Sequence, residues 1–455
     1  MLNTETLALD AVTLAASLTG DVVAPGDKEY DLARRAWNLA VDQRPALVAF
    51  PADAADVRAV VDFARVRGLR VAPQGTGHNA SPLPRLDDVI LLSTQRMRGV
   101  EIDVERRIAR VAAGTLWLEV TSVASEHGLA PLSGSSPDVG VIGYTLGGGL
   151  SWLGRKYGLA ANSVTAIELV TADGRFVRAT ADHEADLFWA LRGGGGNLGV
   201  VCAMEFRLYE EPAVYAGMLL WPAEAAREVL AAWVEWTRTV PDEVTTSARI
   251  LHVPPLPELP EVVRGRSIVV IDGAVAGGVA DPAAVLAPLR RLAPEVDTFA
   301  HVPPVALSRI HMDPEQPMPY MGHGELLGEL DAAAIDAIVD VSGPESGLFM
   351  AELRHLGGAV GRMPEGAGAA GRLHGQYLSF AGGMVASPEM AEAVEAGLDR
   401  LGAALAPWAN GAHYLNFTEK RVDPATFYAP ADYARLQEIR ATVDPRGLFV
   451  ANHAV

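Results

Sequence analysis

The pattern of apolar and polar residues near the N-terminal end predicts two strands with a helix between them. Residues 46–50 form a short apolar run, which is typical of a buried strand. Within residues 53–68, apolar side chains recur at helical spacing between a capping aspartate and a terminal glycine. Residues 69–72 form a second strand, which ends at the loop PQGTGHNA, residues 73–80. Open α/β folds bind ligands in crevices at such strand ends.

Short strands and helices continue through residue 208. The expected strands are 89–92, 100–104, 108–112, 167–171, 176–178 and 200–208, and the expected helices are 116–127 and 186–191. Gly194, Gly196 and Gly199 form a GxGxxG match, but an expected helix precedes it and an expected strand follows it. The dinucleotide fingerprint needs the reverse order, so we reject a nicotinamide-binding Rossmann fold.

A change in composition at residues 210–212 marks a second region, which extends to residue 411. It mixes helices with alternating strands, which predicts a separate α+β domain with an antiparallel sheet flanked by helices. The strands expected there include 267–271, 349–354 and 376–380. Beyond residue 411 the character changes again, and we expect a short strand at 413–417 and a helix at 432–442.

Length, charge and cysteine content narrow the classes of function. The 455 residues exceed what one hydrophobic core accommodates, so several domains are expected. The net charge of −19 argues against nucleic acid or an anionic membrane as a partner, because both attract basic patches. Cys202 is the single cysteine, which excludes an intrachain disulfide, and its apolar neighbours indicate a buried, unreactive thiol. With no signal-peptide pattern and no apolar run of about 18 residues, we expect a cytoplasmic protein with a small-molecule ligand.

Two glycine-rich stretches indicate a bound cofactor. Gly75 and Gly77 allow tight turning of the first loop, whose N–H groups can form a nest for a phosphate. His78 stands at the edge of this loop and would be bonded to the ligand; an ordinary surface histidine is the alternative. The second stretch, residues 133–158, sets glycines among large apolar side chains, which indicates backbone packed against a flat group and not a flexible linker.

Taken together, the motifs resemble those of the flavin-dependent oxidoreductases of the vanillyl-alcohol-oxidase and berberine-bridge-enzyme group, which carry a PCMH-type FAD-binding domain. The resemblance covers nearly the whole chain. Its motifs are GTGH at 75–78, the glycine block at 139–159, the segments 170–179 and 186–201, YLN at 414–416 and the closing segment 444–455.

The resemblance implies the domain organisation. Residues 1–208 would be the FAD-binding domain with two α/β subdomains, and residues 209–411 the substrate domain with the antiparallel sheet. Residues 412–455 would be the berberine-bridge segment that returns to the FAD-binding domain.

The resemblance also implies a covalent bond between the flavin and His78. Family members with two flavin bonds carry a cysteine where this chain has Ser136, and serine cannot form that link. The chain is therefore expected to belong to the monocovalent branch. The segment 161–163 reads ANS where members often have ADN, which places one polar contact to the cofactor in doubt. The full set of expected cofactor contacts is Gln74, Gly75, Thr76, Gly77, His78, Asn79, Ser136, Val139, Gly140, Gly143, Tyr144, Gly147, Gly148, Gly149, Gly199, Val201, Asn416 and Asn452.

Flavin chemistry needs a group that takes the substrate's proton while hydride passes to flavin N5, and Tyr414 is the expected base. Its pKa, ordinarily about 10, must be lowered for this role, and a packed, hydrogen-bonded tyrosine is the alternative. Glu352, Arg354 and Gln376 stand at period-two spacing on two expected strands and would line the substrate pocket. The alternative for them is a solvated, salt-bridged face, and no metal is expected.

The resemblance implies an oxidase of an alcohol or sugar, an amine or a natural-product intermediate. Val139 falls at the family's oxygen-gatekeeper position, where valine resembles oxidases, so O2 and hydrogen peroxide are expected as co-substrate and co-product. An oxidative cyclase and a non-redox flavin-binding protein are the alternatives. The protein is expected to act as a monomer or homodimer.

Overall fold

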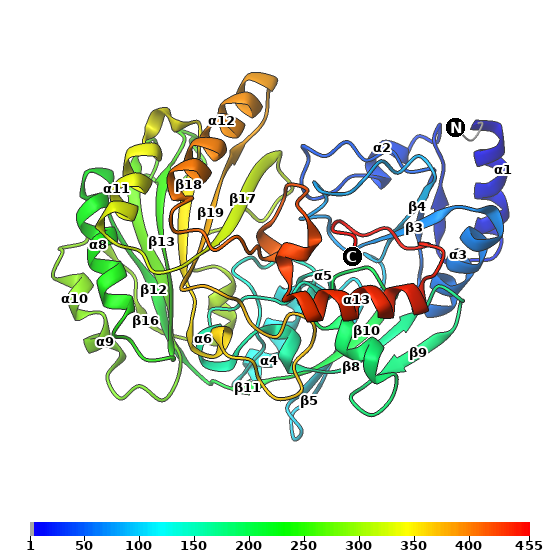
Figure 1. The fold of residues 1–455 in the computed structure, drawn as a ribbon, viewed down its shortest axis with the longest axis horizontal. Coiled ribbons are helices and arrows are strands. Elements are labelled where there is room, and N and C mark those ends of the chain that lie inside the picture. The colour runs from blue at the N-terminus through cyan, green and yellow to red at the C-terminus, as the bar shows by residue number, and fades with distance from the viewer. Residues whose placement is uncertain (1–3) are drawn as a thin grey trace.

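The first sheet of the protein carries the loop that follows the second predicted strand. The computed structural model describes residues 4–455 (Figure 1). Strands of this sheet run in the order β1-β2-β4-β3, with β2, β4 and β3 parallel. The fourth strand thus lies between the two strands of the predicted strand–helix–strand unit. Its elements are α1 (Thr4–Ala15), β1 (Asp21–Val23), α2 (Tyr30–Ala33), β2 (Leu47–Phe50), α3 (Ala54–Arg67), β3 (Arg70–Gln74) and β4 (Val89–Ser93).

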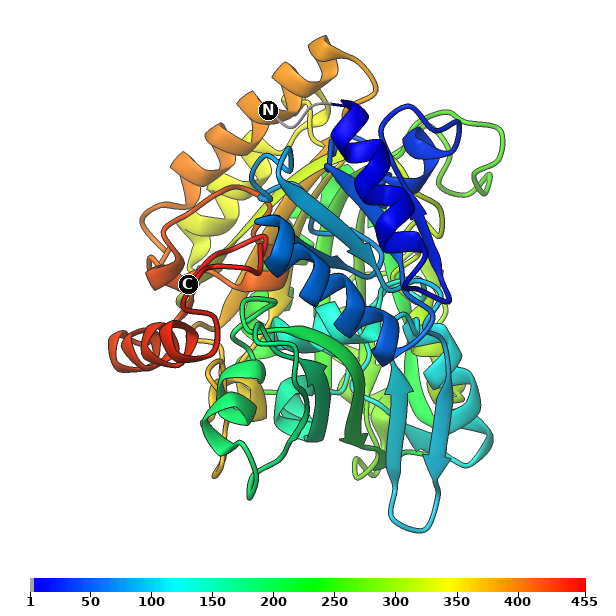
Figure 2. The ribbon, with the colours of Figure 1, turned by 90° about the vertical axis from the view of Figure 1, so that its right-hand side faces the viewer.

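The second sheet is antiparallel, in the order β5-β6-β10-β8-β9, and α3 packs between it and the first sheet (Figure 2). Helix α3 begins at Asp53, whose carboxylate accepts from two backbone N–H groups, and ends at Gly68 with φ of 67°. The elements are β5 (Val100–Asp103), β6 (Ile108–Ala112), α4 (Trp117–Glu126), β7 (Leu129–Ala130), α5 (Val141–Leu146), α6 (Gly154–Tyr157), β8 (Val164–Val170), β9 (Phe176–Ala179), α7 (Ala185–Leu191), β10 (Val200–Arg207) and β11 (Tyr209–Glu210).

Two predictions concern the surroundings of β10. The GxGxxG match does lie between α7 and β10, which confirms that it is not a dinucleotide fingerprint. Cys202 is buried in the core between the two sheets, and burial raises the pKa of its thiol to about 12. The predicted burial of Cys202 is confirmed, and the raised pKa disfavours the reactive thiolate form.

The antiparallel sheet predicted for the second region is present; it has eight strands, and one of its faces is covered by α8, α11 and α12 (Figure 1). Its strand order is β15-β12-β14-β13-β18-β19-β17, with β16 also paired to β12. The mixed α+β fold class is confirmed. The elements are β12 (Val214–Pro222), α8 (Ala226–Thr237), β13 (Val244–His252), β14 (Ser267–Val275), α9 (Pro282–Val285), α10 (Ala287–Arg290), β15 (Val296–Asp297), β16 (Ala300–Val302), β17 (Tyr320–Leu327), α11 (Ala332–Val341), β18 (Met350–His355), β19 (Tyr377–Met384) and α12 (Pro388–Leu405).

The C-terminal segment leaves the eight-stranded sheet and returns to the first sheet. After α13 (Pro430–Val443), Phe449 forms a parallel bridge with Val71 of β3. The strand predicted at 413–417 is wrong. A 3₁₀ turn, Leu415–Phe417, stands there because the N–H of Phe417 donates back to the carbonyl of Tyr414. Among residues 4–455, none of the helices combines the length and apolarity needed to cross a bilayer.

Candidate active site

The loop after β3 is shaped by a residue that has no room for a side chain. Gly77 has φ of +81°, and a Cβ there would come within 2.9 Å of the Cβ of Ala36. Gln74 ends β3 and accepts a hydrogen bond from Gln43. Gly75, in contrast, faces open space, with no protein atom within 4 Å of an added Cβ. The loop is therefore held on one side and open on the other.

His78 is oriented by three neighbours. Its Nδ1 lies 2.7 Å from the hydroxyl oxygen of Thr76, and its ring stacks on Trp37 with ring centroids 4.3 Å apart. Its Nε2 is buried, has no hydrogen-bond partner and lies 3.5 Å from a carboxylate oxygen of Asp138. Buried polar atoms usually have a hydrogen-bond partner, so this nitrogen has the capacity to pair with a bound group.

Asp138 connects the first loop to the second glycine-rich stretch. Its carboxylate accepts from the indole N–H of Trp37 and from the hydroxyl of Ser136. Burial pushes the pKa of Asp138 up, but the His78 imidazole and these two donors bring the net pKa below its ordinary value. Ser136 is thus a hydrogen-bond donor at the position where a second flavin bond would need a cysteine.

The second glycine-rich stretch contains α5 and contacts the first loop. Gly140, at the N-terminus of α5, would place a Cβ 3.8 Å from Thr76, and Gly143 faces open space. Gly148 and Gly149 have φ of +113° and +79°, which few residues other than glycine adopt. A Cβ on Gly149 would also come within 2.5 Å of the ring of Tyr144.

Tyr414 and Asn416 pack against this stretch from the C-terminal segment. The amide of Asn416 donates to the carbonyl of Tyr144 at 2.9 Å and to the phenol oxygen of Tyr414 at 3.0 Å, and a Cβ on Gly147 would overlap it. Burial raises the pKa of Tyr414 well above its ordinary value. This shift opposes the role of base predicted for Tyr414, which requires a lowered pKa and stays a prediction.

The remaining expected cofactor contacts fall into two groups. Asn79 donates to the carbonyl of Leu415 at 3.0 Å, and Asn452 donates to the carbonyl of Asn79 at 3.4 Å, so both join the C-terminal segment, residues 412–455, to the first loop. Val139 packs at the edge of the core of the second sheet. Gly199 and Val201 lie at the start of β10 and pack within that sheet, Gly199 directly against Leu169.

Glu352 and Arg354 lie on the face of the eight-stranded sheet opposite its covering helices. The Glu352 side chain is 0% exposed and that of Arg354 is 12% exposed, with Nε of Arg354 2.8 Å from the Glu352 carboxylate. A solvated, salt-bridged face is therefore excluded. Gln376 precedes β19, opposite Leu356, and its side chain is exposed at the end of the strand pair. The structure does not bury Gln376 with the other two.

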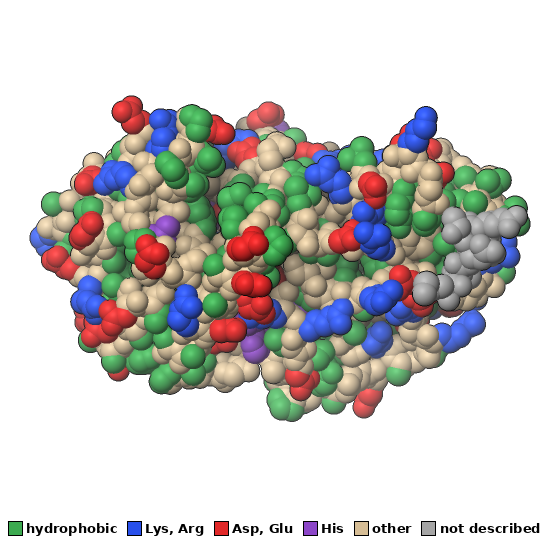
Figure 3. Space-filling model, turned by 90° about the horizontal axis from the view of Figure 1, so that it is seen from above, with side chains coloured by type: hydrophobic (Ala, Val, Ile, Leu, Met, Phe, Trp, Pro, Cys, Tyr) green, Lys and Arg blue, Asp and Glu red, His purple; other side chains and the backbone are tan. Residues whose placement is uncertain are grey.

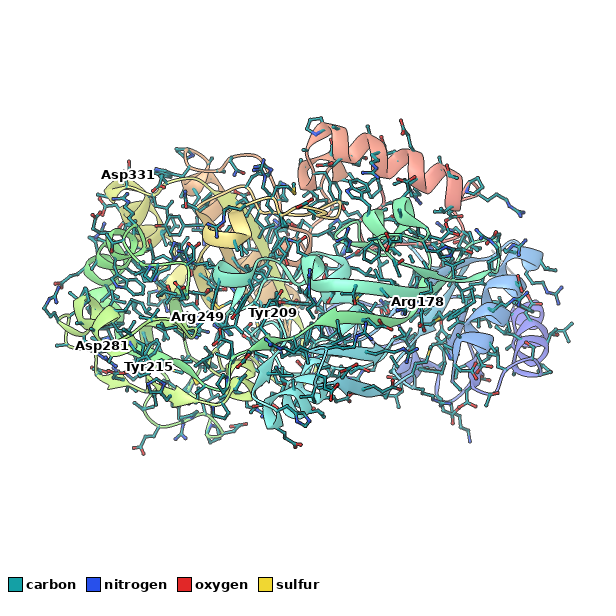
Figure 4. The ribbon with its side chains drawn as sticks, turned by 90° about the horizontal axis from the view of Figure 1, so that it is seen from below. Arg178, Tyr209, Tyr215, Arg249, Asp281 and Asp331 are labelled. Carbon is teal, nitrogen blue, oxygen red and sulfur yellow. The ribbon has the colours of Figure 1, made fainter. Side chains whose placement is uncertain are left out.

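A buried polar cluster behind this pair was missed in the sequence. Asp272 on β14 forms an ion pair with Arg249 of β13 and lies 2.9 Å from Nδ1 of His311; Figure 4 shows Arg249 in the interior of this half of the molecule. Nε2 of His311 lies 3.4 Å from the Glu352 carboxylate and 3.2 Å from Arg354. An aspartate inside the apolar run of β14 was the one signal of this cluster.

The cluster and the glycine-rich loops are electrostatically connected. Arg354 stands over the ring of Phe417 at 4.8 Å, and Phe417 in turn stacks on Tyr414 at 5.6 Å. The positive charge of Arg354 lowers the pKa of Tyr414, although burial outweighs it. The two halves of the molecule thus contribute to one site.

The residues present fit a flat, polar cofactor such as a flavin. Two glycine-rich loops face each other, and Gly75 and Gly143 leave room beside the backbone. Buried polar atoms without partners gather at the same loops, among them Nε2 of His78, Oδ1 of Asn79 and the hydroxyl of Thr145. Unpaired buried polar atoms are costly, so a cofactor that pairs them would stabilise the site. Fold and site together define a flavin-binding oxidoreductase.

Comparison with known families agrees with this class. Residues 45–180 match the family described as FAD binding domain, and residues 413–455 match the family described as Berberine and berberine like. The chain is an FAD-linked oxidoreductase with FAD as its cofactor, and it is similar to the PCMH-type, berberine-bridge-enzyme-like family.

Three relatives illustrate the similarity. (R)-6-hydroxynicotine oxidase of Paenarthrobacter nicotinovorans is 36% identical over 206 residues, which are 45% of this chain and 45% of that protein, so the match spans under half of its length. The crystal structure of 6-hydroxy-D-nicotine oxidase from Arthrobacter nicotinovorans superposes with a TM-score of 0.83 at 27% identity, covering 95% of this chain and 97% of that one. The uncharacterized FAD-linked oxidoreductase YvdP of Bacillus subtilis is 27% identical over 95% of this chain and 97% of its own length.

Proposed function

We propose that this protein is an FAD-dependent oxidase of a small amine, with the flavin covalently attached to His78. The observation that carries the covalent link is the His78 ring, held by Thr76 and Trp37 with a buried, unpartnered Nε2 beside Asp138. When bound, the flavin supplies a two-electron acceptor that dioxygen re-oxidises, with hydrogen peroxide as co-product.

The charges of the buried cluster support an amine over the other two substrate classes. Three carboxylates, Asp272, Asp313 and Glu352, face two guanidinium groups, Arg249 and Arg354. Leaving His311 aside, the formal charge of this cluster is 2 − 3 = −1. A site of net negative charge favours a cationic ligand such as a protonated amine. The relative with 36% identity is named as an oxidase of hydroxynicotine, which is consistent with this proposal.

Glu352 is better placed than Tyr414 to accept the substrate's proton. Both carboxylate oxygens of Glu352 are buried; Arg354 holds Oε1 in an ion pair at 2.8 Å, and Oε2 has no hydrogen-bond partner. Tyr414, with its raised pKa, stays protonated and supports Asn416. Glu352→Gln is expected to lower kcat by roughly 10²–10⁴-fold, as for loss of a general base. Tyr414→Phe is the matched comparison. If it lowers kcat as much as Glu352→Gln or more, Tyr414 and not Glu352 is the base.

The covalent link is tested by precipitating the protein with acid and measuring the mass of the peptide that contains His78. We expect a peptide heavier by one flavin, and an unmodified peptide in His78→Ala. Replacement of the exposed His301 by alanine is the control and should leave the link intact. A wild-type peptide without added mass, with all flavin in the supernatant, would refute the proposal.

The substrate class is tested by oxygen consumption with panels of amines, alcohols and sugars. Turnover of amines alone would support the proposal, and turnover of sugars alone would overturn it. The face of the molecule in Figure 3 carries acidic and basic side chains interspersed, consistent with small-molecule partners. A cytoplasmic location, a monomer or homodimer, and the absence of nucleic-acid and membrane partners stay predictions of the sequence.

A further inference from the structure

Three metal-ligand side chains meet where β17 passes the C-terminal segment. His323 and Glu325 stand two residues apart on β17, and His413 directly precedes Tyr414. One ligand atom from each of the three lies within 4.8 Å of the other two. The backbone joins the two segments nearby, since the N–H of Leu326 donates to the carbonyl of Ala412 at 3.3 Å. In Figure 1 the strand and the red-orange segment lie side by side.

Each of the two imidazoles has a nitrogen available for a metal. Nδ1 of His323 is buried and has no hydrogen-bond partner. Nδ1 of His413 lies 3.1 Å from the hydroxyl oxygen of Thr426, which orients the ring and leaves Nε2 free. A metal-binding histidine usually has its other ring nitrogen held by a hydrogen bond in this way.

We propose that His323, Glu325 and His413 bind a divalent transition-metal cation of the Zn²⁺ type. Two imidazole nitrogens and one carboxylate oxygen are ligands that Zn²⁺ takes, whereas Ca²⁺ and Mg²⁺ prefer oxygen alone. This revises the expectation that the protein holds no metal. The proposal does not depend on the oxidase activity.

The surroundings permit entry and a further ligand. His323, Glu325 and Lys420 line a cleft of about 370 Å³, which admits water to a fourth coordination position. The ammonium of Lys420 opposes a cation, but it lies 3.2 Å from the Asp399 carboxylate, which offsets its charge. Glu325 supplies the negative charge of the ligand set itself.

A metal here would act as a positioning device. It would link the C-terminal segment to the eight-stranded sheet at His413, the residue that precedes Tyr414. Tyr414 and Asn416 are the C-terminal residues that pack on the second glycine-rich stretch. Metal binding is therefore expected to raise the melting temperature and to steady the C-terminal side of the cofactor site, without a chemical step at the metal.

The test uses the full chain with its flavin, freed of metal by a chelator and titrated with Zn²⁺ alone. We expect one tight Zn²⁺ per chain by calorimetry and by metal analysis after dialysis, and a melting temperature that rises to saturation. His323→Gln and Glu325→Gln should each abolish tight binding. His301→Gln, which removes an exposed histidine of the same half, should bind as the wild type does. Thr426→Val should weaken binding by roughly 10–100-fold, as for loss of an outer-shell partner.

Flavin content and circular dichroism of each variant separate loss of the site from loss of the fold. Co²⁺ binding to the wild type gives an independent readout, because a tetrahedral site produces visible absorption bands at longer wavelength than the flavin. Tight binding that survives in both His323→Gln and Glu325→Gln overturns the proposal. Absence of Zn²⁺ binding and of Co²⁺ bands in the wild type overturns it as well.

Discussion

Replacing Asp272 by asparagine should destabilise the protein strongly, because Asp272 is the counter-charge of Arg249 inside the eight-stranded sheet. Its side chain is 0% exposed and that of Arg249 is 4% exposed. Asp272 also lies 2.9 Å from Nδ1 of His311 and accepts from the hydroxyl of Ser247. The substitution leaves the guanidinium of Arg249 buried without a counter-charge.

The expected cost follows from this burial. Removing one partner of a buried ion pair costs about 3–5 kcal/mol of unfolding free energy. The strands of this sheet span residues 214–384, a unit of the size for which 1 kcal/mol shifts the melting temperature by about 2–4 °C. The expected fall is therefore roughly 6–20 °C. Burial raises the pKa of Asp272, but the Arg249 charge and the hydrogen bonds with His311 and Ser247 bring it below its ordinary value. The stabilisation is thus present above the unfolded pKa of about 3.9 and is lost as the pH falls through the lower folded value.

Thermal unfolding of the flavin-loaded protein at pH 7 measures this cost, with two comparisons. Asp340→Asn removes a partner of Arg227 whose side chain is 68% exposed, and should cost less than about 1 kcal/mol. Asp272→Asn combined with Arg249→Met removes the buried charge as well, so its cost should fall below the sum of the single costs by roughly 0.5–3 kcal/mol. A fall under about 2 °C for Asp272→Asn, or strict additivity in the double variant, would refute the reasoning.

Three further predictions concern the cofactor site. Glu419 accepts from the hydroxyl of Tyr320, which also lies 3.3 Å from the carbonyl oxygen of His78. Burial raises the pKa of Glu419 to about 8, so its stabilising contribution is complete below the unfolded pKa of about 4.3 and is lost as the pH rises through 8. The melting temperature of Glu419→Gln, measured relative to that of the wild type, should therefore increase as the pH rises from 5 to 9. A difference that does not change with pH would contradict this. Gly149→Ala should lower the melting temperature, because φ at this position is +79° and the new Cβ would come within 2.5 Å of the Tyr144 ring. Gly75 faces open space, so Gly75→Ala should keep the melting temperature of the wild type. The absorbance of the purified Gly75→Ala protein should show less bound flavin. Trp37→Ala removes a ring stack on His78 worth about 0.5–1.5 kcal/mol. This variant should show a smaller fraction of flavin that precipitates with the protein, and Trp37→Phe should restore part of that fraction.

Local signals identified the parts of the site that depend on backbone shape. Gly77 and Gly149 mark turns that other residues cannot make, and the sequence alone shows them. Trp37 and His311 carried no such signal, because their roles arise from contacts across long sequence distances. Trp37 meets His78 and Asp138, and His311 meets Asp272 and Glu352 only after two strands and a loop pack together.

The strand wrongly predicted at residues 413–417 shows how function-related packing overrides local pattern. An alternating run of five residues is a weak strand signal, and a strand needs a neighbour for its N–H and C=O groups. Here the carbonyl of Tyr414 accepts from Phe417 and from the hydroxyl of Thr418, so the backbone is satisfied within a turn. The turn places Tyr414 and Asn416 together on the glycine-rich stretch, with the Asn416 amide donating to both the Tyr144 carbonyl and the Tyr414 hydroxyl. The turn is thus the conformation that lets this segment close the cofactor site, and residues distant in the chain select it.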